Sequence, residues 1–120
     1  MPRVIEYRHS CLGPIRLFRA ESFLYRLGGL LILPRLQAGE ALLLSPCKGI
    51  HTFGMTYPLA LVFLDAQARI VGWREPVAPW RLAPGPSATR QVLEMLPDTL
   101  ASGRGRLHKG AAFWRAGEPA

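Results

Sequence analysis

The chain has 120 residues, of which 49% are hydrophobic and 19% charged, and it carries a formal net charge of +7. This length predicts one domain, residues 1–120, that folds alone, and the apolar content excludes general disorder. The longest apolar runs, 27–33 and 59–64, are far shorter than the ~20 residues of a membrane-spanning helix. The first eight residues lack the apolar core of a signal peptide, so we expect a cytoplasmic protein.

The cysteine count and the charge distribution exclude further classes of protein. Cys11 and Cys47 are too few for a disulfide scaffold, so we expect free thiols. Most of the 15 basic residues are scattered arginines, and only the Gly-rich segment 104–109 concentrates them. Because there is no basic helix, no aromatic–basic motif and no zinc-finger spacing, the pattern favours weak non-specific polyanion binding over specific nucleic-acid recognition.

The first half of the chain predicts short strands and one helix. Apolar and polar residues alternate in 4–7 and 15–18, which is typical of two half-buried strands around a turn. Residues 20–27 change to a helical period, with Ser22 as a candidate cap and Gly28 as a candidate end. A buried strand is predicted for 41–44.

The segment 59–64 gives the strongest structural prediction. All six of its residues are apolar, so both faces of the strand should be covered by protein. A turn at 65–68 and a returning strand at 69–74 complete a hairpin. The proline-rich stretch 76–86 is expected to be an irregular loop, because each proline removes a backbone donor.

The last third predicts a strand at 91–95, a short helix from Pro97 to Gly103 and a closing segment at 111–114, followed by a flexible tail at 116–120. Together these elements predict a mainly β fold. We expect a compact antiparallel β-sandwich or closed barrel with one or two short helices.

Six spaced motifs between about residues 24 and 113 resemble the domain of unknown function 192, a family of small prokaryotic proteins of uncharacterised function. These motifs are Arg26–Leu31, Leu43–Cys47, Ile50–Met55, Pro58–Leu59 with Val62–Asp65, Pro79–Arg81 and Val92–Glu94. The resemblance implies a compact, mainly antiparallel β domain with short helices, and it implies no activity or cofactor.

Three positions depart from the pattern that this family usually shows. Ala60 replaces an acidic residue, which would remove any carboxylate chemistry at that point. Ala68 replaces a turn glycine, so a left-handed backbone there would cost about 1 kcal/mol and the turn type could differ. Ala41 replaces another glycine, a change that strengthens a strand.

The segment Cys47–Met55 concentrates the chemistry of the chain, because Cys47, His51 and Met55 recur every four residues. These three side chains could bind copper(I), or zinc if Met55 is left out, although a closed site usually has four ligands. In the simpler interpretation, Cys47 and Met55 pack in the core while His51 bonds to backbone carbonyls or to Glu94.

A thiol enzyme is a further alternative, with Cys47 as nucleophile, His51 as base and Glu94 orienting the base. Neither a helix N-terminus at Cys47 nor an oxyanion-hole motif accompanies this set. Glu94 fits a buried carboxylate paired with Arg81 or Arg26 better than a general base.

The preferred interpretation is a non-catalytic domain without a cofactor, which binds an unidentified protein or small-molecule partner. Polar groups within glycine- and proline-rich loops commonly serve recognition. The candidate surface combines the Cys47–Met55 and Pro79–Arg81 segments. Its residues are His51, Thr52, Phe53, Met55, Pro79, Trp80 and Arg81, with Glu94 as an associated polar group.

Overall fold

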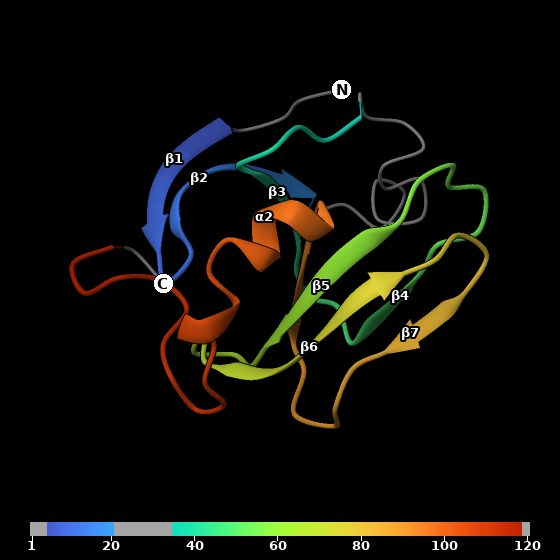
Figure 1. The fold of residues 1–120 in the computed structure, drawn as a ribbon. Helices are drawn as coiled ribbons and strands as arrows, with labels where there is room; N and C mark the ends of the chain where they lie inside the picture. The colour runs from blue at the N-terminus through green and yellow to red at the C-terminus, as the bar shows by residue number, and fades with distance from the viewer. Residues whose placement is uncertain (1–4, 21–34, 119–120) are drawn as a thin grey trace.

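The computed structural model describes residues 5–20 and 35–118, so the helix predicted for 20–27 and the Arg26 partner of Glu94 lie outside the described residues. The described part is mainly β (Figure 1). Its strands are β1 (Ile5–Ser10), β2 (Gly13–Ala20), β3 (Glu40–Leu44), β4 (Gly49–His51), β5 (Leu59–Leu64), β6 (Ile70–Val77), β7 (Leu82–Pro84) and β8 (Gln91–Met95), joined by α2 (Pro97–Ala101) and the 3₁₀ turn η2 (Arg104–Arg106). None of the helices in these ranges is long and apolar enough to span a membrane.

Six of the strands form one sheet in the order β1-β2-β3-β8-β5-β6. All neighbours are antiparallel except β2 and β3, which run parallel. The sheet is therefore mainly antiparallel, and the expected antiparallel arrangement fails at this pair. Residues 21–39 connect the two strands, and a connection of that length allows the crossover that parallel strands need.

The sheet is not closed into a barrel, so the predicted sandwich or closed barrel is not confirmed. Its end strands, β1 and β6, do not pair with each other. The C-terminal segment contacts both ends through the isolated bridges of Ser10 with Trp114 and of Arg69 with Ala112. Beyond this segment, Glu118 accepts hydrogen bonds from the His9 backbone N–H at 3.2 Å and pairs with its ring at 3.1 Å.

Strand β5 is covered on both faces, as the sequence predicted. All six of its residues are buried. Ala60, Val62 and Leu64 face one hydrophobic cluster, which also contains Leu100 of α2. The alternate residues of β5, namely Leu59, Leu61 and Phe63, face a second cluster on the opposite side of the sheet. Because successive side chains of a strand point to opposite faces, one apolar run supplies both halves of the core.

The turn between β5 and β6 keeps a left-handed residue although glycine is absent. Ala68 has φ 59°, and its N–H donates to the Asp65 carbonyl at 3.0 Å. The Asp65 carboxylate accepts from the backbone N–H groups of Gln67 and Arg69, each at 2.9 Å. Ala68 is buried in the first cluster, so packing of its methyl group offsets the backbone strain of about 1 kcal/mol.

Strands β4 and β7 pair antiparallel and form a separate two-stranded ladder, which Figure 1 shows beside the main sheet at the end away from β1. The expectation of an irregular loop across 76–86 is wrong for β7. A proline is tolerated here because β7 is a short strand with one partner and Pro84 stands at its end. Gly49 permits the pairing, since a Cβ there would lie 2.7 Å from the Cα of Pro84.

Candidate functional site

Three aromatic rings lie against one another beside the β4–β7 ladder, and we call them the aromatic platform. The ring centroids of His51 and Phe53 are 4.9 Å apart with planes at 27°, and those of Phe53 and Trp80 are 6.0 Å apart at 24°. Phe53 is 40% exposed and Trp80 is 65% exposed. The platform is therefore a short stack of rings that is partly exposed to solvent, most of all at Trp80.

A buried threonine joins the two segments that carry the platform. The Thr52 hydroxyl donates to the Ala78 carbonyl at 2.7 Å and accepts from the Arg81 N–H at 2.9 Å. The Thr52 backbone N–H donates to the Arg81 carbonyl at 2.9 Å, and the Trp80 N–H donates to the Thr52 carbonyl at 3.0 Å. Four hydrogen bonds to one fully buried residue fix the position of Trp80 relative to Phe53.

Two local features of the platform are the backbone conformation of Trp80 and the tautomer of His51. Trp80 has φ 63°, a left-handed value that costs a bulky residue roughly 1–3 kcal/mol. The His51 Nδ1 accepts a hydrogen bond from the Phe53 N–H at 3.2 Å, which assigns the proton of the neutral ring to Nε2. The exposed imidazole therefore keeps an Nε2–H donor for a ligand.

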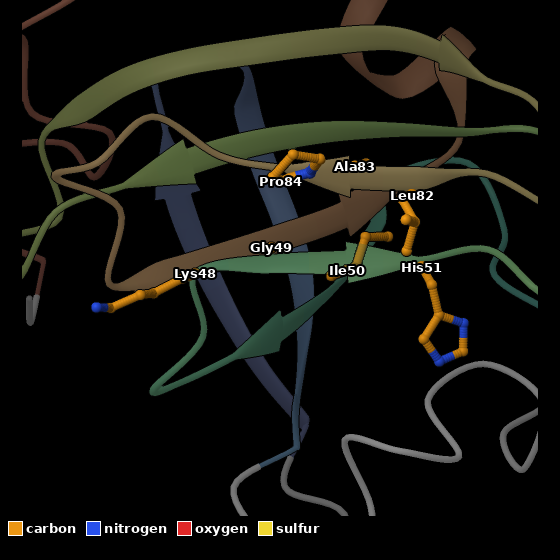
Figure 2. Close-up of a pocket in the computed structure, with 7 residues that line it drawn as sticks. All are labelled: Lys48, Gly49, Ile50, His51, Leu82, Ala83 and Pro84. Carbon is orange, nitrogen blue, oxygen red and sulfur yellow. The ribbon is translucent and has the colours of Figure 1, made fainter.

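A pocket of about 410 Å³ lies on the β4–β7 ladder next to the platform. Figure 2 shows Lys48 and His51 at opposite ends of β4, with Ile50 on β4 and Leu82 on β7. Leu82 is 68% exposed, so its side chain supplies apolar surface at the mouth of the pocket. The lining residues are Lys48, Gly49, Ile50, His51, Leu82, Ala83 and Pro84.

The segments that build this region carry no acidic residue. The sequence has none between Glu40 and Asp65, and none between Glu75 and Glu94. The same two segments contain Lys48, which lines the pocket, and Arg81, which is exposed beside Trp80. The local charge is therefore positive and has no neutralising carboxylate within either segment.

Most of the predicted surface comes together, but two of its residues do not belong to it. His51, Thr52, Phe53, Trp80 and Arg81 lie together through the ring contacts and the Thr52 hydrogen bonds, and the half-buried Pro79 precedes Trp80 in the same loop. Met55 instead packs in the second hydrophobic cluster, and Glu94 is buried within β8. The sequence reasoning missed Leu82 and Lys48. A single leucine in a short strand and a single lysine are too common in sequences to indicate a binding site.

The structure separates the three side chains of the alternative metal site. Met55 is buried in the second cluster, whereas His51 is exposed. The Cys47 thiol donates to the Gly49 carbonyl at 3.0 Å. In residues 5–20 and 35–118, no group of three or more His, Cys, Asp or Glu side chains is placed to hold a metal ion. The His51 Nδ1 bonds to the Phe53 N–H, so this nitrogen is already occupied and does not orient toward the thiol.

Glu94 is a buried carboxyl group on the second-cluster face of the sheet. It lies in register between Leu42 of β3 and Leu61 of β5 and is 5% exposed. Burial raises the pKa of the Glu94 carboxyl from 4.5 to about 8. The predicted partner Arg81 is exposed and donates to the Trp80 carbonyl instead. At neutral pH the folded protein therefore holds Glu94 mainly in its protonated form.

The fold and the site define a small, mainly β domain with an exposed aromatic platform. The chain belongs to the DUF192 family, described as uncharacterized ACR, whose pattern it matches over residues 7–105. No curated protein matches the chain.

Two solved structures share the fold. A protein of unknown function from Novosphingobium aromaticivorans has a TM-score of 0.71 and 19% identity, covering 90% of this chain and 81% of that one. A protein from Sinorhizobium meliloti, described as a "putative transcription regulator", also has a TM-score of 0.71, with 17% identity and 92% of each chain covered. At these identities the likeness concerns the fold alone.

Proposed function

We propose that this protein is a non-catalytic binding module that holds its ligand or partner on the aromatic platform and the adjoining β4–β7 pocket. The observation that carries the proposal is the exposure of rigidly held rings. Among the described residues, the large exposed hydrophobic side chains are Tyr7, Phe53, Trp80 and Leu82, and three of these four lie at this one region. Exposed apolar groups gathered in this way typically mark an interaction site.

The energetic cost of the arrangement supports the same conclusion. Trp80 is held in a strained left-handed conformation while most of its side chain faces water. Neither feature stabilises the free protein, because exposed apolar area gains nothing from folding. Tryptophan and arginine in a preformed position are the residue types that dominate binding energy at interfaces, and Trp80 and Arg81 are adjacent.

The binding role is tested with a library of small aromatic compounds and two-dimensional amide NMR spectra of the whole chain. We expect the strongest binders to shift the amides of 51–53 and 80–82, and Trp80→Ala to abolish these shifts. Tyr7→Ala is the matched control, because Tyr7 is 66% exposed and contacts His9 on the distant strand β1. Shifts spread over the whole surface, or shifts retained in Trp80→Ala, would contradict the proposal.

A further inference from the structure

The aromatic platform has the geometry of a stacking surface for flat rings. Adjacent rings are inclined by 27° for His51 and Phe53 and by 24° for Phe53 and Trp80, and Trp80, at one end of the stack, is 65% exposed. The exposed pair on β1 differs, since the rings of Tyr7 and His9 meet edge to face at 80°. A further planar group can stack on rings that are arranged in this way.

The charges around the platform select an anionic ligand. Lys48 lines the adjoining pocket, Arg81 follows Trp80 directly, and the segments 41–64 and 76–93 hold no acidic residue. The chain as a whole carries a formal charge of +7, so long-range attraction adds to the local field. The ligand should therefore combine planar rings with closely spaced negative charges.

Building on the binding role proposed above, we propose that this surface binds single-stranded nucleic acid, with bases stacking on the aromatic platform and phosphates near Lys48 and Arg81. Stacking platforms beside cationic grooves are the usual solution for binding single strands without sequence preference. An acidic peptide would satisfy the two cations, but it would have no use for three nearly parallel ring planes. A duplex satisfies the cations equally, but its bases are stacked on one another and cannot reach Trp80.

The sequence predicted the two segments of this surface but not the stacking of their rings, because the segments are far apart along the chain. His51 and Phe53 follow β4, whereas Trp80 and Arg81 precede β7. The Thr52 hydrogen bonds to Ala78 and Arg81 bring the two segments together across 26 and 29 positions. A linear search for aromatic–basic motifs therefore misses an arrangement that exists only in the folded protein.

The test measures fluorescence anisotropy of a labelled twelve-nucleotide oligothymidylate at several salt concentrations with the full chain. We expect Trp80→Ala to weaken binding by about 5- to 150-fold, the range found for removing one stacking partner. Tyr7→Ala should leave affinity unchanged. Lys48→Ala combined with Arg81→Ala should lower the slope of log affinity against log salt by about 1.4, or 0.7 for each lost phosphate contact. Thermal unfolding of each variant confirms that it is folded.

Three outcomes would overturn the assignment. One is equal affinity for the twelve-base-pair duplex, and another is unchanged affinity in Trp80→Ala, because either places binding on general surface charge. The third uses a labelled peptide of alternating glutamate and tryptophan. If this peptide binds in a Trp80-dependent manner and the oligonucleotide does not, the ligand class is wrong while the binding role stands. If neither ligand nor any aromatic compound depends on Trp80, both proposals fail.

Discussion

The six-stranded sheet and the β4–β7 ladder use their side chains in opposite ways. Strands β3 and β5 are buried at every position and pack on clusters on both faces of the sheet. The strands of the ladder have three residues each, and His51 and Leu82 at one end of it are exposed. The sheet is thus held by apolar burial, whereas the ladder leaves much of its apolar surface in water.

A small domain can thus keep a contact surface outside its hydrophobic core. The ladder is positioned by the close approach at Gly49, by the hydrogen bonds of Thr52 and by Ala83 of β7, which is buried in the second cluster. Because main-chain atoms and small buried side chains supply these contacts, the larger neighbouring side chains are released from a packing role. Phe53, Trp80 and Leu82 can therefore remain exposed.

The largest expected effect comes from making the same substitution in both regions. Leu61→Ala in the sheet should lower the free energy of unfolding by about 2–5 kcal/mol, because it leaves a cavity in the second cluster. Leu82→Ala in the ladder should change it by less than about 0.5 kcal/mol, since Leu82 is 68% exposed. Urea unfolding of both variants measures the two values. Similar losses would show that the ladder is part of the core after all.

The next effect concerns Glu94, a buried carboxyl group on the second-cluster face of the sheet. Because the folded pKa of Glu94 is raised to about 8, the folded state binds a proton more tightly than the unfolded state between pH 4.5 and 8. Stability is therefore greatest at the acidic end of this window and falls as pH rises through it. Glu94→Gln carries no charge, so it should be more stable than the wild type at pH 8 by about 2–4 kcal/mol and similar to it at pH 5.

Denaturant unfolding at both pH values provides the comparison for Glu94. Leu61 and Leu42 flank Glu94 in register, so the substitution tests an apolar environment directly. A Glu94→Gln variant that loses stability to the same extent at pH 5 and pH 8 would show that the ionised carboxylate is accepted in the fold.

The smallest of these effects is expected at Thr52, whose hydroxyl holds the two segments of the ladder together. Thr52→Val keeps the volume of the side chain but removes the hydroxyl that bonds to the Ala78 carbonyl and the Arg81 N–H. We expect a loss of about 1–3 kcal/mol, because Arg81 N–H then lacks its acceptor. Amide hydrogen exchange should accelerate at Arg81 and Trp80 while Leu93 in the main sheet keeps its protection. Uniform acceleration over both regions would contradict a local role for Thr52.

The sequence-based prediction succeeded where a single physical effect, such as the burial of apolar side chains, determines the structure. The run 59–64 could be placed as a strand buried on both faces because only protein on each side can cover six consecutive apolar residues. The family was also identified from spaced motifs, and the match over 7–105 confirms it. The same reasoning failed for β7, because a proline signals a missing donor but does not show whether that position needs one.

The candidate surface was predicted as two segments, but its internal arrangement was not. Met55 was included in this surface, but it packs in the second hydrophobic cluster, as the simpler interpretation of Cys47 and Met55 predicted, and a turn at 53–54 separates it from His51. Lys48 and Leu82 were overlooked because their role depends on the pocket formed by pairing β4 with β7.

The amino-acid sequence by itself determined the mainly β character, the buried central strand and the excess of positive charge, since each follows from composition or from period along the chain. The stacking of His51, Phe53 and Trp80 and the burial of Glu94 within an apolar face depend instead on how the chain folds. The two kinds of feature differ in how far apart along the chain the interacting residues lie. Periodicity reports contacts between residues close in sequence, whereas ring stacking and desolvation depend on which distant segments the sheet brings together.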